Sequence, residues 1–118
     1  MNGRIFYLRE QMLKDLNRKW TVEELAQEIK VSAPYLQQLF KKEMQISPIA
    51  YLRDVRLKKA CELLETTFDN ISEIRYKVGM PNDSHFTRDF KKKYGVTPTE
   101  CRRQYWGKIQ VEQSDGKK

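Results

Sequence analysis

Residues 36–42 read LQQLFKK and are followed by ISP at 46–48, while residues 86–92 read FTRDFKK and are followed by VTP at 96–98. The second copy follows the first after about fifty residues, and a fixed period of this kind indicates a duplicated supersecondary unit. The sequence therefore predicts two related structural units in one chain.

A short amphipathic segment precedes each copy, at residues 22–29 and 71–78, so each half has the pattern of helix, turn, helix. Apolar residues at helical spacing predict one more helix at the start, over residues 4–17. Residues that favour helix N-termini precede the later helices: Thr21, Ser32, Ser47, Asn70, Asn82 and Thr97. No segment alternates apolar and polar residues as a strand does. The predicted fold class is all-α, with about seven helices.

The charge of the chain points to a polyanionic partner. The chain has 118 residues and a net charge of +7, with a pI of about 9.5. Basic side chains cluster in and after each copy of the motif. Such clusters also occur on ordinary solvated helix faces, but their recurrence at matching places in two copies favours a binding role.

Membrane, metal and catalytic functions find little support in the residues. There is no apolar run of about eighteen residues and no leader segment, so we expect a cytoplasmic protein at the nucleoid. Cys61 and Cys101 lack the paired spacing of a zinc site or disulfide framework, and Cys61 is expected to be a small buried hydrophobe. His85, the only histidine, has no nearby catalytic partner in sequence. We predict no enzyme activity, no cofactor and no metal.

Over about residues 20–105, the chain resembles the DNA-binding domain of the AraC/XylS family of bacterial transcription regulators. The strongest parts are residues 51–64 and the stretch FTRDFKKKYGVTP at 86–98, which looks like the signature of that family. The resemblance implies two homeodomain-like helix-turn-helix subdomains joined by a long linking helix. The second helix of each subdomain would then enter one of two successive major grooves.

The resemblance also implies domain boundaries. The first subdomain is expected at residues 4–50, the linking helix at 48–66, the second subdomain at 67–107 and a polar C-terminal tail at 108–118. A linker of about eighteen residues spans roughly 27 Å, close to the roughly 34 Å between successive major grooves on one side of the duplex. Bending of the DNA would supply the remainder.

Candidate DNA contacts follow from matching positions in the family. The expected base-reading residues are Pro34, Gln37, Gln38, Asp83, Ser84, Thr87 and Arg88. The expected phosphate contacts are Ser32, Lys41, Lys42, Lys91 and Lys92. Glutamine is suited to adenine and arginine to guanine, so Arg88 is the strongest single candidate for base reading.

The second unit departs from the family pattern at several positions, including Met80 where phenylalanine is expected and Asp89 where an apolar residue is common. Arg75 stands where a small alanine usually packs against the partner helix, whereas the first unit keeps Ala26 there. Close packing should suffer there unless the aliphatic stem of Arg75 lies flat and its charged head reaches water or phosphate. Asp83 places a negative charge near DNA. The second unit is therefore expected to be the weaker or more adaptable reader.

The favoured function is sequence-specific binding of double-stranded DNA by a transcription regulator, or by the excised C-terminal domain of one. RNA polymerase is a further candidate partner, and a fragment would lack an effector-binding, dimerisation or receiver domain. The alternative is a helical protein-interaction module that binds an acidic surface of the transcription machinery. A third class, DNA-repair methyltransferases with a similar domain, needs metal-ligand neighbours that Cys61 and Cys101 lack in sequence.

Overall fold

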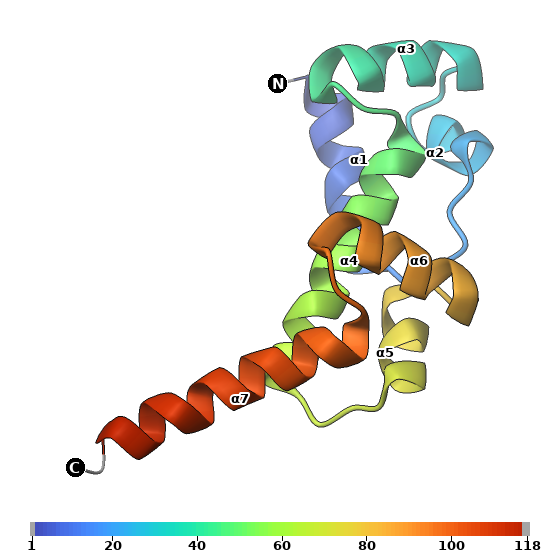
Figure 1. Ribbon diagram of the computed structural model, residues 1–118. Coiled ribbons are helices and arrows are strands. Elements are labelled where there is room, and N and C mark those ends of the chain that lie inside the picture. Colours follow the sequence, from blue (N-terminus) through green and yellow to red (C-terminus); the bar gives the residue numbers. More distant parts are fainter. Residues whose placement is uncertain (1, 117–118) are drawn as a thin grey trace. The chain divides into compact units, whose positions relative to one another are not determined.

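The computed structural model describes residues 2–116, and of 109–116 it describes the backbone only. Over residues 2–116, the chain forms seven α-helices and no strand, as the sequence predicts (Figure 1). The helices are α1 (Gly3–Lys14), α2 (Val22–Glu28), α3 (Ala33–Met44), α4 (Pro48–Thr66), α5 (Ile71–Val78), α6 (Asp83–Tyr94) and α7 (Pro98–Gly116). None of the helices within these residues is both long and apolar enough to cross a bilayer.

The predicted helix starts are confirmed by hydrogen bonds. In each case a side-chain oxygen accepts a bond from a backbone N–H in the first turn of the next helix; the residues are Thr21, Ser32, Ser47, Asn70, Asn82 and Thr97. Before α5, Glu73 also accepts a bond from the backbone N–H of Asn70, which completes a capping box. These bonds pair amide groups that have no partner inside the helix, so local sequence fixes where each helix begins.

The chain divides into two compact units, Met1–Arg56 and Leu57–Lys118. In the first unit, α1, α2, α3 and the start of α4 surround a core in which Phe40 packs edge-on against Tyr51, with ring centroids 5.6 Å apart. The other buried members of this core are Ile5, Leu8, Met12, Trp20, Leu25, Ala26, Leu36 and Leu52. Burial of aromatic and aliphatic side chains is the main force that holds three short helices together.

The second unit has an equivalent core built from the end of α4 with α5 and α6. Phe86 and Phe90 are fully buried, with ring centroids 5.9 Å apart. Their buried neighbours are Leu57, Ala60, Leu64, Ile74 and Val78. The phenylalanines of both motif copies are therefore core residues, as their helical spacing predicts.

α4, which covers the expected linking helix at 48–66, supplies buried residues to both cores. Tyr51 and Leu52 belong to the first core, and Leu57, Ala60 and Leu64 belong to the second. The boundary between the units falls within α4, after Arg56. An apolar stripe that runs along a helix has to be buried over its whole length, so this helix serves as a core element of each unit.

Two helix ends differ from the predictions. α1 stops at Lys14 instead of continuing to residue 17, because Asp15 leaves the helical conformation and its carbonyl accepts a hydrogen bond of 3.0 Å from the Trp20 indole. At the other end, α7 continues to Gly116, into the segment expected as a polar tail at 108–118. Polar residues such as glutamine, glutamate and lysine are good helix formers, so a polar segment is compatible with a helix.

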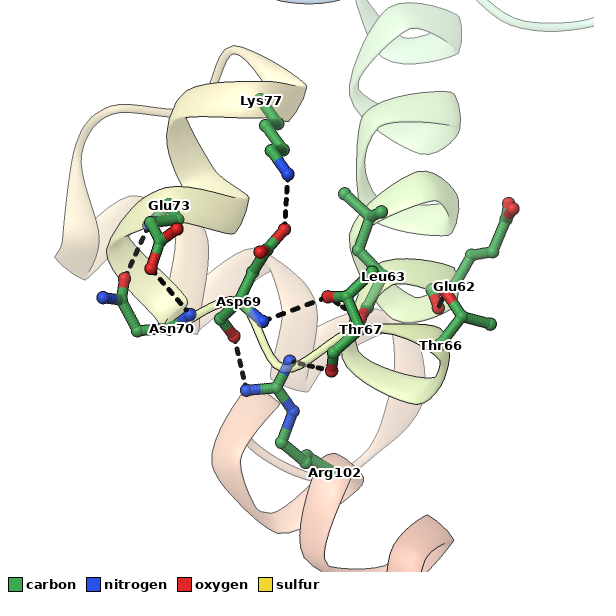
Figure 2. Close-up of polar contacts among 9 residues, drawn as sticks. All are labelled: Glu62, Leu63, Thr66, Thr67, Asp69, Asn70, Glu73, Lys77 and Arg102. Atoms are coloured by element: carbon green, nitrogen blue, oxygen red, sulfur yellow. Dashed lines mark hydrogen bonds and ion pairs between the residues drawn. The ribbon is translucent and has the colours of Figure 1, made fainter.

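The loop between α4 and α5 is held by one arginine of α7. The Arg102 guanidinium donates to the carbonyl oxygens of Leu64 at 3.0 Å, Asp69 at 2.6 Å and Thr67 at 3.1 Å. Figure 2 shows the last two of these bonds, together with the bond from the Lys77 ammonium to the Asp69 carboxylate. Arg102 thereby satisfies the Leu64 carbonyl in the last turn of α4, which has no partner within the helix, and two carbonyls of the following loop.

Candidate nucleic-acid interface

α3 is the second helix of the first helix-turn-helix, and it has two distinct faces. Leu36 and Phe40 are buried in the core, whereas Gln37, Gln38 and Lys41 are exposed. This division follows from the helical period, because residues three and four apart share a face. The first unit therefore presents the amide groups of two glutamines to solvent from a helix anchored by its apolar side.

The ends of α3 carry the other expected contacts of the first unit. Ser32 and Pro34 are exposed at its start, and the Ser32 Oγ already accepts a hydrogen bond of 3.3 Å from the Tyr35 N–H. Lys41 and Lys42 are exposed in its last turn. The two lysines also complement the negative end of the helix dipole, which stabilises the helix independently of any ligand.

α6 repeats this division of faces in the second unit. Phe86 and Phe90 are buried, Ser84 and Arg88 are exposed, and Thr87 is half-buried. The Arg88 side chain is 68% exposed, and its Nε lies 3.3 Å from Oδ1 of the neighbouring Asp89. A guanidinium has five N–H donors, so this contact leaves the rest of the fork able to bind a ligand.

Lysines also mark the end of α6. Lys91 and Lys92 are exposed in the last turn, at positions that correspond to Lys41 and Lys42 in the first unit. Both helices end in a residue with a left-handed backbone, Gln45 with φ 69° and Gly95 with φ 81°. The two units thus share the arrangement of core face, exposed polar face and basic end.

Arg75 is the main difference from the expected site. Its guanidinium does not extend into solvent: one terminal nitrogen donates to the Pro81 carbonyl, and its Nε lies 3.6 Å from Asp83 Oδ1. The Arg75 side chain is only 17% exposed. Instead of reaching solvent, the Arg75 head is held by the Pro81 carbonyl in the turn between α5 and α6 and by the Asp83 carboxylate at the start of α6.

This contact also changes the electrostatics of Asp83, an expected base-reading residue. Asp83 is the first residue of α6 and its side chain is 70% exposed, but its carboxylate is paired with Arg75. A positive charge at this distance offsets the repulsion between the carboxylate and a DNA phosphate. Nothing in the sequence between Arg75 and Asp83 signals the pair, since it depends on how the turn brings α5 and α6 together.

Cys61 also differs from its expected role as a small buried hydrophobe. The side chain is half-buried, and it lies beside Cys101 and Glu65 in the second unit. The two cysteines are separated by 39 intervening positions in the chain, so spacing could not reveal the cluster. The packing of α7 against α4 brings them together.

In each unit a three-helix arrangement exposes the polar face of its second helix and places lysines at the end of that helix. An α-helix of this kind fits the major groove of B-form DNA, and lysine favours phosphate. Fold and surface together define a protein with two helix-turn-helix units of the DNA-binding type.

Comparison with known proteins agrees with this class. The family model described as "Helix-turn-helix domain" matches residues 25–104, more than half of the chain. The chain belongs to the AraC/XylS-type helix-turn-helix family of DNA-binding domains from transcription regulators. The matched residues include all of α3 and α6.

Individual relatives support the assignment. The chain is similar to the HTH-type transcriptional regulator MtrA of Neisseria gonorrhoeae, with 28% identity over 86% of this chain and 34% of MtrA. Its structure is similar to that of the C-terminal domain of AraT, a response regulator from Geobacillus stearothermophilus. That match has a TM-score of 0.82 and 35% identity, and it covers 87% of this chain and 86% of the AraT domain. The chain spans about a third of the length of MtrA.

The fold is also similar to that of the DNA-binding domain of AdpA, a global transcriptional factor solved in complex with a target DNA. The TM-score is 0.86 at 21% identity, over 91% of this chain and 96% of the AdpA domain. At this identity the likeness concerns the fold.

Proposed function

We propose that this chain binds double-stranded DNA sequence-specifically, as the DNA-binding part of a transcription regulator. The observation that carries the proposal is the division of faces on α3 and α6, each anchored by buried phenylalanine and exposing polar and basic side chains. The fold is shared with the AdpA domain, which was solved in complex with a target DNA, and this supports DNA binding by the present chain.

Within this proposal, α3 and α6 read bases with their exposed faces. Gln37 and Gln38 are suited to bidentate hydrogen bonds with adenine, and Arg88 to guanine O6 and N7. The remaining base-reading candidates are Pro34, Asp83, Ser84 and Thr87, and the phosphate candidates are Ser32, Lys41, Lys42, Lys91 and Lys92. Asp83 is the least favourable of these for contact with DNA, because its carboxylate is negatively charged and the Arg75 pair at 3.6 Å offsets only part of that charge.

The decisive experiment has two steps. Duplexes bound by the whole chain are first selected from a random pool at physiological salt, and the selected duplex is then altered one base pair at a time. We expect Arg88→Ala to weaken binding to the selected duplex and to abolish discrimination at one base step, worth about 1–3 kcal/mol. An equal loss of affinity for every duplex would mean that Arg88 contacts only the DNA backbone.

Lys59→Ala is a control for the loss of one positive charge. Lys59 lies in the second unit but on α4, where it pairs with Glu62 at 3.3 Å. We expect this variant to keep the full base preference of the unaltered chain. If Lys59→Ala and Arg88→Ala had the same effect on base preference, the proposal that α6 reads bases would be contradicted.

The selected duplexes also test whether both units read DNA. Two boxes about one helical turn apart are expected if α3 and α6 occupy successive major grooves, whereas a single box would limit sequence reading to one unit. A contact with RNA polymerase, a further effector-binding, dimerisation or receiver domain, and action at the nucleoid in the cytoplasm stay predictions of the same proposal.

A further inference from the structure

Three potential metal ligands lie together in the second unit, and none of them is among the expected DNA contacts. Cys61 and Glu65 are one turn apart on α4, and Cys101 lies in the first turn of α7. The two sulfur atoms and a carboxylate oxygen of Glu65 all lie within 4.8 Å of one another, and Cys61 Sγ is 4.0 Å from Glu65 Oε2. All three residues are half-buried.

This donor set has the composition of a site for a thiophilic metal ion. In a tetrahedral zinc site with Zn–S bonds of about 2.3 Å and Zn–O bonds of about 2.1 Å, neighbouring donor atoms lie roughly 3.5–3.8 Å apart. The donors here, up to 4.8 Å apart, have to approach by about 1.3 Å at most, which small side-chain rotations on two helices provide. Half-burial leaves a path for the ion and room for a fourth ligand from solvent.

We propose that Cys61, Glu65 and Cys101 form a binding site for one thiophilic metal ion, Zn²⁺ or Cu⁺, which joins α4 to α7. The two ions share a preference for thiolate ligands, so the same cluster accepts either. Glu65 is the ligand that favours Zn²⁺, because carboxylate oxygen suits Zn²⁺ better than Cu⁺. The site is separate from the proposed DNA contacts and does not depend on them.

Metal binding at this site is coupled to proton release. Burial is the largest cause that raises the pKa of the Cys61 thiol to about 12, and the neighbouring Cys101 and Glu65 raise it further, while a hydrogen bond from Tyr94 opposes them. Burial also raises the pKa of Cys101. Both thiols are protonated at neutral pH. When the ion binds, two S–H bonds break, two metal–sulfur bonds form and two protons pass to the buffer, with no change in oxidation state.

The consequence for the protein is a cross-link between two helices of the same unit. A ligand that binds the folded state only stabilises it in proportion to its concentration and affinity. We expect the melting temperature of the reduced chain to rise with Zn²⁺ concentration. A pH rise from 6 to 8 strengthens the binding, because fewer protons then compete for the thiolates.

The test uses the whole chain, reduced and free of metal, titrated with Zn²⁺, with Cu⁺ under anaerobic conditions, and with Cd²⁺ as a spectroscopic probe. Ultraviolet absorption of cadmium–thiolate bonds is expected to saturate at one ion per monomer. Cys61→Ser and Cys101→Ser should each abolish this absorption. Glu65→Gln should weaken Zn²⁺ binding by about tenfold or more and Cu⁺ binding much less.

Glu62→Gln is the matched control for Glu65→Gln, because Glu62 also lies on α4 but is exposed and paired with Lys59. It should leave metal binding unchanged. A second measurement needs no variant: bound Zn²⁺ should protect both thiols of the unaltered chain from iodoacetamide. The proposal is overturned if the cadmium absorption survives Cys101→Ser, if the ion bridges two chains, or if Zn²⁺ gives no protection.

Discussion

Arg75 and Asp83 join the two helices of the second helix-turn-helix, with Arg75 Nε lying 3.6 Å from Asp83 Oδ1. Another nitrogen of Arg75 donates to the Pro81 carbonyl in the intervening turn. Where the first unit has the small residue Ala26, the second unit has an arginine that holds the turn and the first residue of α6. This places the arginine in a positioning role for α6.

We expect Arg75→Ala to lower the free energy of unfolding by about 1–2 kcal/mol. A charged hydrogen bond contributes about 1.5–3 kcal/mol, and the burial of Arg75 Nε without a hydrogen-bond partner offsets part of that gain. Urea unfolding measures the change. Asp83→Asn, which keeps the bond to Pro81, should cost less. A higher melting temperature for Arg75→Ala would instead mean that the arginine strains the packing of α5.

Arg102 is expected to be the most important polar side chain for the stability of the second unit. It donates to three carbonyl groups at the end of α4 and in the following loop (Figure 2). Arg102→Ala leaves these part-buried groups without that partner, so we expect a loss of about 3 kcal/mol. The neighbouring Arg103 is exposed, and Arg103→Ala should change the stability by less than about 0.5 kcal/mol. Equal losses for the two variants in urea unfolding would contradict the role of Arg102.

The ends of α3 and α6 provide a matched pair of substitutions. Gln45 and Gly95 both have a left-handed backbone, and their N–H groups donate to the carbonyls of Lys41 and Lys91 at 2.8 and 2.7 Å. Only glycine adopts this conformation without strain. Gln45→Gly should therefore stabilise the first unit by about 0.5 kcal/mol, reduced from about 1 kcal/mol by loss of the Gln45 bond to the Lys42 carbonyl.

Gly95→Ala should destabilise the second unit by about 1 kcal/mol. A Cβ atom at this position would meet nothing within 4 Å, so the loss would come from the backbone alone. Thermal unfolding of the two variants beside the unaltered chain gives both changes. If both variants were stabilised, or both destabilised, the left-handed backbone at Gln45 and Gly95 would not be the cause of the stability changes.

The helices and their buried faces follow from local rules, which is why the sequence predicts them. Spacing of Phe86 and Phe90 determines which side of α6 is buried, and the side chain of Asn82 determines where α6 begins. The exposed position of Arg88 follows from the same periodicity. These features require only the residues within one or two turns.

Contacts between helices could not be predicted in this way. The pairing of Arg75 with Asp83 and the approach of Cys61 to Cys101 depend on the angle and distance at which helices pack. The early end of α1 likewise depends on Trp20, whose indole N–H donates a hydrogen bond to the Asp15 carbonyl. In each case the partner is chosen by tertiary packing, which periodicity and capping patterns do not encode.

Lys92 is expected to contribute to DNA affinity without contributing to base preference. It is exposed at the end of α6, where it can neutralise one phosphate. Lys92→Ala should make the slope of log affinity against log salt less negative by about 0.9 and weaken binding to all duplexes alike. The measurement is a titration of the selected duplex at several salt concentrations. A slope near zero for the unaltered chain would favour the alternative function, in which an acidic protein surface is bound through mainly apolar contacts.

The raised pKa of Cys61 predicts how the second unit responds to alkaline pH. The thiol has a pKa of about 12 in the folded chain, against a reference value of 9.0 for the unfolded chain, and burial is the largest cause. Between these values the unfolded state binds fewer protons, so the free energy of unfolding falls as the pH rises above about 9. Cys61→Ser removes this dependence. Between pH 8 and pH 10, the free energy of unfolding of the unaltered chain should therefore fall relative to that of the variant.

The comparison has to be made as a difference, because burial also raises the pKa of Cys101, and the resulting loss of stability above about pH 9 is present in both proteins. Metal-free, reducing conditions keep the Cys61 thiol titratable. The same thiol should react with iodoacetamide at least about tenfold more slowly in the native chain than in urea at pH 8, because the thiolate is the reactive form. Parallel stability curves together with equal alkylation rates would mean that the Cys61 thiol is solvated in the folded protein, and its neighbours would then have no influence on its proton.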